Sequence, residues 1–133
     1  MQFGYAAAKL DDIANFIPAR ISFIFILIAV ILRSERVTNC IHIFMRDRGK
    51  HASPNAGQSE AAFAGALGLR LGGKNSYDGI IERIPYIGDE IEFFTIEHID
   101  RANAIMLIAS GCFIVTASLG VHLFYYFTEG AVK

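Results

Sequence analysis

The chain has 133 residues, enough for one domain. Hydrophobic residues make up 53% of it, and the mean hydropathy of +0.41 lies at the apolar end of the range for soluble domains. Twelve basic and 13 acidic residues leave a net charge of −1, which excludes the basic footprint of a general nucleic-acid-binding protein.

Two helices are expected in the first quarter of the chain. Apolar and small residues recur at helical spacing over residues 3–15, and Pro18 interrupts the pattern. A second helix is expected from Ala19 to Leu32. Its apolar run, Ile21 to Leu32, has only 12 residues. The run is therefore either a membrane span with a polar first turn or a half-span whose start is buried in protein.

The central part of the chain is expected to contain two more helices and a long irregular segment. One helix covers residues 34–45, a loop follows over 46–57, and a helix of small residues runs from Gln58 to Leu71. Gly72-Gly73 is the expected C-cap of that last helix. Residues 74–96 carry turn signals without alternating apolar residues, so no strand is expected there.

The last expected helix, residues 99–127, is the best candidate for a membrane span. Its part from Ala104 to Phe127 has 24 residues and no formal charge, long enough to cross a hydrocarbon core of about 30 Å. Basic residues follow the first apolar run closely, which indicates a cytoplasmic central segment. Cys40 and Cys112 lie far apart in apolar runs and are expected to be buried free thiols. The expected fold class is all-α, a multi-pass integral membrane helical protein.

The first cluster of polar residues that could carry chemistry is Asp11-Asp12, with Asn15 and Arg20 behind it. Adjacent carboxylates suit a magnesium ion beside a phosphate. The Arg20 guanidinium suits a phosphate or a carboxylate. A solvated helix start, with Arg20 at the membrane interface, explains the same residues, and spacing alone favours this simpler interpretation.

The second cluster combines charged residues with a helix-start signal, and its members are Arg46, Asp47, Arg48, Lys50, His51, Ser53, Pro54 and Asn55. Ser53 is the expected N-cap of a helix with Pro54 in its first position, and such a helix start attracts anions. An ordinary basic loop beside a membrane would explain the cations. It does not explain Asp47, His51 and Asn55 among them.

The central segment has two further features with more than one interpretation. Residues 68–75, GLRLGGKN, nearly match the phosphate-loop pattern GxxxxGK[ST]. That pattern requires a strand before the loop and a helix after it, whereas a helix is expected before this segment and irregular chain after it. We therefore interpret it as a helix end. Glu60 stays open as a base, a metal ligand or an ordinary residue of a first helical turn.

Two segments of the chain resemble the signature segments of the adenosylcobinamide-phosphate synthase family, also called CobD/CbiB. They are DDIANFIPARIS at residues 11–22 and RDRGKHASPNAGQSEAAFAGALGLRLGG at residues 46–73. The joint occurrence of DDxxNxxPAR and HxSPNAGxxEAA is specific. The family consists of multi-pass inner-membrane proteins of cobalamin biosynthesis, so the resemblance implies the bacterial cell membrane as the location.

The resemblance implies an amide-forming ligase that uses ATP and Mg²⁺. Its corrinoid substrate, adenosylcobyric acid, is joined to aminopropanol phosphate or a related amino alcohol. Activating the carboxylate calls for Mg²⁺ and fixed cations, and the attacking amine calls for a base. We therefore assign His51 and Asp47 as catalytic residues and Asp11 and Asp12 as Mg²⁺ ligands. The residues assigned to phosphates or substrate carboxylates are Arg20, Arg46, Arg48, Lys50, Ser53 and Asn55.

The family's proteins are longer, with further membrane helices before the DDxxN segment. We therefore expect residues 1–133 to be a single domain, the C-terminal portion of such a protein. The expected partners are the lipid bilayer, the missing N-terminal half or further copies of the chain, and no nucleic acid. The alternative to an enzyme is a non-catalytic membrane subunit or a truncated remnant. A small transporter is a weaker alternative, because intramembrane charge is sparse.

A geometric condition applies to a single site. If residues 13–32 cross the membrane fully, Asp11 and Asp12 lie on the opposite side from His51. One site then cannot use both clusters. Either the first apolar run folds back, or one cluster is structural.

Overall fold

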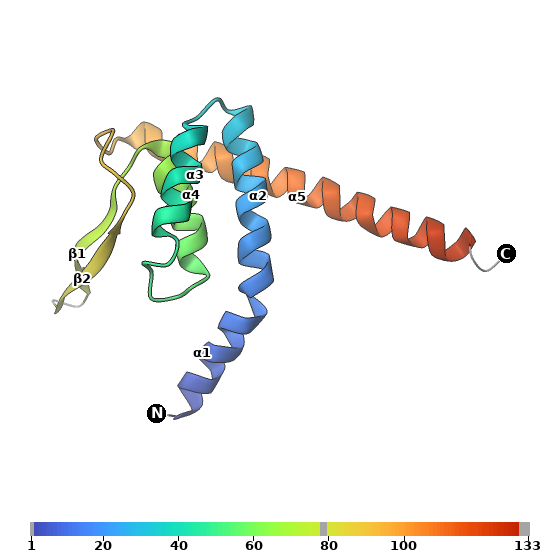
Figure 1. Ribbon diagram of the computed structural model, residues 1–133, viewed down its shortest axis with the longest axis horizontal. Helices are drawn as coiled ribbons and strands as arrows, with labels where there is room; N and C mark the ends of the chain where they lie inside the picture. Colours follow the sequence, from blue (N-terminus) through green and yellow to red (C-terminus); the bar gives the residue numbers. More distant parts are fainter. Residues whose placement is uncertain (1, 78–79, 131–133) are drawn as a thin grey trace.

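The computed structural model describes residues 2–77 and 80–130, and most of them are helical (Figure 1). In chain order the elements are α1 (Gln2–Ala14), α2 (Phe16–Leu32), α3 (Val37–Asp47), α4 (Ala56–Leu67), β1 (Leu71–Tyr77), β2 (Ile80–Ile87) and α5 (Ile96–Gly130). Helices α2, α3 and α4 lie side by side, and the β1–β2 hairpin stands next to α3 and α4. Helix α5 crosses α2 and continues well beyond it.

The helices lie close to their expected ranges, and α2 begins three residues earlier than expected. Pro18 lies in the first turn of α2, where backbone N–H groups make no helical hydrogen bond, so the absence of an N–H on proline does not disrupt the helix. The chain therefore bends at Asn15, between α1 and α2, rather than at the proline. The helical hydrogen bonds continue on both sides of this bend, because Asn15 N–H donates to Asp11 O at 2.9 Å and Ala19 N–H donates to Asn15 O at 3.0 Å. Only Asn15 separates the two helices.

The expectation of an all-α fold is wrong, because residues 71–87 contain an antiparallel β-hairpin. Strand β1 pairs with β2 from Leu71 opposite Ile87 to Tyr77 opposite Ile80. The register shifts between Leu71 and Gly73, which marks a bulge. Gly72 has a φ of +93° there, a conformation that favours glycine. The two glycines expected to cap a helix therefore belong to a strand.

Helix α4 ends at Gly68, earlier than expected, and it packs closely on α3. Gly68 has a left-handed φ of +69° and supplies the C-cap. A Cβ on Gly65 would lie 2.7 Å from both Asn39 O and Cys40 Cα, so only glycine allows this helix spacing. The Asn39 amide donates to Gly65 O at 2.7 Å. The small residues of α4 therefore allow α3 and α4 to pack closely.

The turn between α2 and α3 reverses the chain with one strained residue. Ser34 N–H donates to Ile31 O and Glu35 N–H donates to Val30 O, each at 3.0 Å. This pair of bonds is a Schellman motif, whose central residue is normally glycine. Here Ser34 occupies that position with a φ of +53°. Helix α3 consequently runs back alongside α2.

The main hydrophobic core joins α2, α3, α4 and the first part of α5. Its fully buried members include Val30, Cys40, Ala62 and Ile105. Burial raises the pKa of the Cys40 thiol to about 11, and both cysteines are free. Cys112 is only partly buried. The expectation of free thiols is therefore confirmed, although burial is complete only for Cys40.

Helix α5 is the one helix within residues 2–77 and 80–130 that is long and apolar enough to span a membrane. The candidate span is Ile96–Glu129, and only 11% of its most apolar window is buried. A core helix of a soluble protein would be mostly buried, so this exposure favours a lipid or protein environment. Helix α2 is apolar but has only 17 residues. The described residues therefore supply one spanning candidate, not the several that a multi-pass arrangement requires.

Candidate functional site

The structure brings the end of α1 into contact with the loop that precedes α4. The Asn55 amide Nδ2 donates to Asp12 O at 2.9 Å, and Ser53 Oγ donates to Asp12 Oδ1 at 3.4 Å. The reversal at Ser34 makes this possible, because α3 returns the chain toward the start of α2. The two signature segments therefore meet on one side of the α2–α3 hairpin.

The loop before α4 has a different local structure from the expected cap. Helix α4 begins at Ala56, and Asn55 is its N-cap residue without a side-chain cap bond. Ser53 Oγ instead accepts a bond from Asn55 N–H at 3.4 Å, which folds the loop locally. A Cβ on Gly57 would lie 2.4 Å from Arg48 O. This glycine lets the loop lie directly on the first turn of α4.

Two buried amide oxygens in this region have no hydrogen-bond partner among the described residues. They are Oδ1 of Asn55 and Oε1 of Gln58, and the Gln58 residue is only 4% exposed. The Gln58 Nε2 donates to Pro54 O at 3.1 Å, which holds this side chain against the same loop. We call Asp12, Ser53, Asn55 and Gln58 the Asp12 site.

His51 lies beside the Asp12 site and makes contact with Glu60. Its Nδ1 accepts a bond from Ser53 N–H at 2.9 Å, so the neutral ring carries its proton on Nε2. The Nε2 atom lies 3.6 Å from Glu60 Oε1. No sequence pattern predicts this pair, because His51 lies in the loop and Glu60 lies in α4.

Asp47 is a fully buried carboxylate with three partners. Arg46 donates to both of its oxygens at 2.8 Å, Lys50 Nζ lies 2.6 Å from Oδ1, and Gly88 N–H donates to Oδ2 at 2.8 Å. The bonds from Arg46 above all hold the pKa of the Asp47 carboxyl well below its usual range. A carboxylate held in its ionised form is poorly suited to carry a proton at neutral pH.

The same cations also bind the β-hairpin. Arg46 donates to Asp89 at 2.9 and 3.0 Å, and its guanidinium lowers the pKa of the Asp89 carboxyl. Lys50 Nζ donates to Tyr86 O at 3.2 Å. We call Arg46, Asp47, Lys50 and Asp89 the Asp47 cluster. It joins the end of α3 to the end of β2.

Three further residues assigned from the sequence have contacts close to their own positions in the chain. Arg20 donates to Phe16 O at 2.7 Å, with its guanidinium 3.3 Å from the centre of the Phe16 ring. The Arg48 guanidinium lies 5.2 Å from the centre of the Phe44 ring. Asp11 is exposed, and its carboxylate accepts a bond from the Asn15 amide at 2.8 Å. None of these contacts reaches the Asp12 site.

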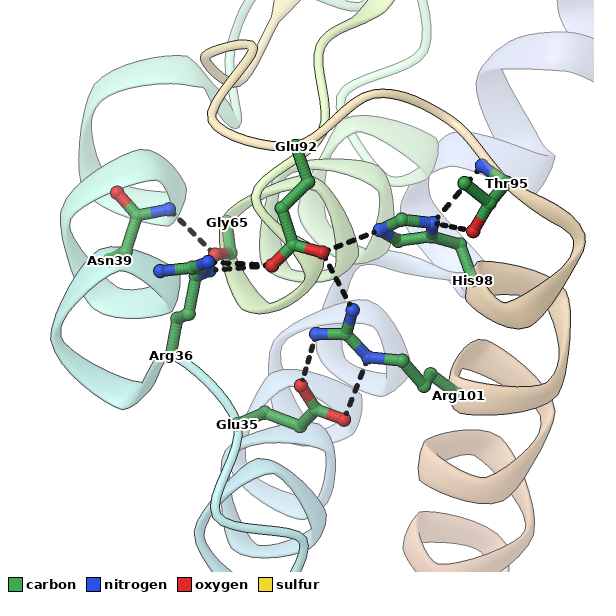
Figure 2. A network of polar contacts seen from close by, with 8 residues as sticks. All are labelled: Glu35, Arg36, Asn39, Gly65, Glu92, Thr95, His98 and Arg101. Carbon is green, nitrogen blue, oxygen red and sulfur yellow. Dashed lines mark hydrogen bonds and ion pairs between the residues drawn. The ribbon is translucent and has the colours of Figure 1, made fainter.

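A second network of charges, not predicted from the sequence, lies where α5 begins (Figure 2). Glu92 accepts bonds from Arg36 at 2.6 Å, Arg101 at 3.0 Å and His98 at 3.1 Å. Arg101 also donates to Glu35 at 2.6 Å. The bond from Arg36 and the one from Arg101 lower the pKa of Glu92 to about 2. Two carboxylates face two guanidinium groups, so this network ties α5 to the α2–α3 turn.

The Asp12 site contains oxygen atoms of the kinds that the implied magnesium ion would need. Within residues 2–77 and 80–130, no three His, Cys, Asp or Glu side chains gather as metal ligands. A metal would therefore need amide oxygens as well as a carboxylate. The unpartnered Asn55 oxygen and the neighbouring Asp12 carboxylate meet that requirement, since Mg²⁺ prefers oxygen ligands. Asp11 has no contact with them.

Comparison with known proteins identifies the family. The chain matches the family model described as CobD/Cbib protein over residues 1–106. It is 42% identical over 107 residues to the cobalamin biosynthesis protein CobD of Klebsiella pneumoniae, covering 80% of this chain and 34% of that protein. The CobD of Citrobacter koseri is 46% identical over 107 residues, with the same shares covered.

A third relative gives the same result. The cobalamin biosynthesis protein CobD of Leptospira interrogans is 40% identical over 110 residues, covering 83% of this chain and 35% of that protein. The chain thus spans about a third of the length of the curated relatives it matches. No solved structure matches it. The match over residues 1–106 contains both signature segments and the contact between them, and the chain belongs to the CobD/CbiB family.

Proposed function

We propose that the chain is part of a membrane-bound adenosylcobinamide-phosphate synthase, an ATP-dependent ligase of cobalamin biosynthesis. It would help to join adenosylcobyric acid to aminopropanol phosphate, or to a related amino alcohol, through an amide bond. The observation that carries the proposal is the contact between Asn55 and Asp12, which joins the two signature segments. Family membership supports the reaction class.

The proposed roles follow from the contacts. When bound, Mg²⁺ would neutralise phosphate charge, with Asp12 and Asn55 as the residues that hold it. The base that deprotonates the attacking amine would come from the pair of His51 and Glu60. With the His51 proton on Nε2 facing Glu60, the Glu60 carboxylate would accept the amine proton and His51 would position that carboxylate. Arg20 and Arg48 remain candidates for binding phosphate or substrate carboxylates. We assign Asp47 to holding the hairpin.

The membrane arrangement is part of the same proposal. Apolar side chains on α2 and α5 are exposed, and a cavity of about 540 Å³ between α2, α4 and α5 is lined mostly by apolar side chains. We propose that lipid and the remaining two-thirds of a full-length protein cover these surfaces, in a multi-pass assembly with residues 33–95 on the cytoplasmic side. Single cysteines at positions 12 and 51 should then react with a membrane-impermeant maleimide from the same side. Reaction from opposite sides contradicts a single site.

Complementation tests the enzymatic role. We expect a strain that lacks the synthase to grow on adenosylcobyric acid when this chain is produced together with the N-terminal two-thirds of a relative. His51→Gln should abolish that growth, while His42→Gln, at an exposed position of α3, should preserve it. Equal growth with His51→Gln would contradict the proposed base.

The second candidate is a non-catalytic membrane subunit. In that case the chain would support growth only beside a complete synthase, and His51→Gln and Asp12→Asn would both leave growth unchanged. Growth that depends on Asp12 would exclude this candidate.

A further inference from the structure

We propose that the side-chain oxygens of Asn55 and Gln58, together with the Asp12 carboxylate, form the binding site of a hard divalent cation such as Mg²⁺. The inference deepens the proposed function, on which it rests for the identity of the ion. Gln58 was not among the residues predicted from the sequence, and of the two adjacent aspartates only Asp12 is assigned to the cation.

The first step is the orientation of the two amides. An Asn or Gln side chain can be turned over without changing its shape, so its oxygen must be identified from its neighbours. The Asn55 amide faces Asp12 O at 2.9 Å, and the Gln58 amide faces Pro54 O at 3.1 Å. A backbone carbonyl only accepts hydrogen bonds, so each amide must present its NH₂ group to it. The atoms left without a partner are therefore both acceptors.

The second step is that the neighbouring cations do not satisfy these acceptors. Arg46 and Lys50 bind Asp47 and the β-hairpin. The Arg48 guanidinium lies over the Phe44 ring. The Asp12 carboxylate has one described contact, a long one of 3.4 Å from Ser53 Oγ. The Asp12 carboxylate contacts the loop at Ser53, and the same loop holds the Asn55 and Gln58 amides, whose oxygens have no described donor.

The third step is the chemistry that such a group selects. A buried acceptor that loses its water is unfavourable until a donor or a cation replaces it. An anion would be repelled by the same oxygens. One carboxylate with neutral amide oxygens suits Mg²⁺, which keeps its other positions for water and phosphate oxygens. The loop that was expected to bind an anion directly would instead bind it through the cation.

The test is cation binding by the purified full chain in lipid nanodiscs, with Mn²⁺ as the probe and electron paramagnetic resonance as the readout. We expect one bound Mn²⁺ that Mg²⁺ displaces. Asp12→Asn should weaken Mn²⁺ binding about tenfold or more, because it removes the charged ligand. Asp11→Asn is the matched control in the same helical turn and should leave binding unchanged. An equal loss in both variants would overturn the assignment.

Gln58 is tested with a second pair of variants. Gln58→Leu removes the buried oxygen and should weaken binding about tenfold, whereas Gln58→Glu keeps an oxygen and should retain binding. Mg²⁺ should also raise the melting temperature of the unmodified chain and not that of Gln58→Leu. Unchanged Mn²⁺ binding in Gln58→Leu would overturn the role of Gln58. If Gln58→Leu fails to fold, the comparison of Mn²⁺ binding by Asp12→Asn and Asp11→Asn still tests the cation site.

The outcomes separate this inference from the proposed function. Complementation that depends on His51, with no Mn²⁺ binding by the chain, would overturn the cation site and leave the ligase proposal in place. Binding of ethanolamine without binding of Mn²⁺ would also overturn it, and would indicate that the acceptors take the ammonium group of the amine substrate. Mn²⁺ binding without complementation would support the site and contradict the ligase.

Discussion

The Asp47 cluster and the Asp12 site both draw on residues 46–58, yet they differ in how far their polar groups are satisfied. Asp47 is completely buried and receives bonds from Arg46, Lys50 and the backbone of Gly88. The Asp12 site contains fewer charges, and two of its buried oxygens have no partner among the described residues. Its capacity for a ligand is therefore larger.

This difference shows that a high density of charged residues does not by itself identify a functional site. A run of charged residues attracts attention in the sequence, but a set that is fully paired inside the fold has a structural task. An amide in a helix of small residues attracts none, but an unpartnered buried oxygen has only a ligand or water to satisfy it. Where these two criteria disagree, the state of pairing is the better guide to the site.

Replacing Asp47 should give the largest effect. Asp47→Asn leaves Arg46 and Lys50 without their buried carboxylate and should destabilise the chain by about 3 kcal/mol. Thermal or denaturant unfolding in detergent, followed by circular dichroism, measures the change. Asp89→Asn, at an exposed position of the same cluster, should cost well under about 1 kcal/mol. Similar losses in both variants would show that the Asp47 cluster is not a buried staple.

Alanine substitutions at Gly57 and Gly49 should test the packing on which the Asp12 site depends. The Gly57→Ala methyl would lie 2.4 Å from Arg48 O, so the loop must move off α4. We expect a cost of about 1–3 kcal/mol and loss of Mn²⁺ binding, while the Asp47 cluster stays intact. Gly49→Ala is the control, since its methyl would meet nothing within 4 Å. Unchanged Mn²⁺ binding in Gly57→Ala would contradict the dependence of the site on this packing.

Acid should weaken paired carboxylates before it affects the helical core. Glu92 has a pKa near 2 in the folded chain, below its ordinary value of 4.5. Because the folded pKa is the lower one, its stabilisation is present above about pH 4.5 and is lost as the pH falls toward 2. Unfolding measured between pH 6 and about 2.5 should show this loss. Glu92→Gln should lower stability at pH 6 and flatten the acid dependence, and an unchanged slope would contradict the pairing.

The smallest expected effect concerns the turn that brings the two clusters to the same side. Ser34 has a positive φ in a Schellman motif, so Ser34→Gly should stabilise the chain by up to about 1 kcal/mol. The melting temperature should rise while Mn²⁺ binding stays unchanged. Destabilisation would mean that the serine hydroxyl contributes more than the strained backbone costs.

The helices were predictable because their periodicity and breaks are local. The hairpin was not, because β1 has the sequence LGGKNSY, without alternating apolar residues. Glycine signals a positive φ, and that conformation serves a helix cap and a strand bulge equally well. The sequence therefore identified where glycine is needed at Gly72 but not which element needs it.

The candidate site was predictable in its segments and not in its internal roles. The two signature segments pointed to Asp12, Ser53 and Asn55, which the fold brings together. The partner of Arg46 at Asp89 and the burial of Asp47 depend on long-range packing, which single-sequence patterns do not contain. Gln58 was missed because its importance lies in a buried oxygen without a hydrogen-bond partner, and the type of a residue does not show whether its atoms will be paired.

The adjacency of Lys50 and His51 has a consequence for how a ligand would be received. Lys50 binds Asp47 and the Tyr86 carbonyl. Further along the same loop, His51 is hydrogen-bonded to Ser53, and Asn55 is hydrogen-bonded to Asp12. If a flexible loop of this length became ordered only when a ligand binds, the loss of loop entropy would weaken the binding affinity. Here the ordering has been completed during folding, so a ligand would meet a preorganised surface and lose little affinity to loop entropy.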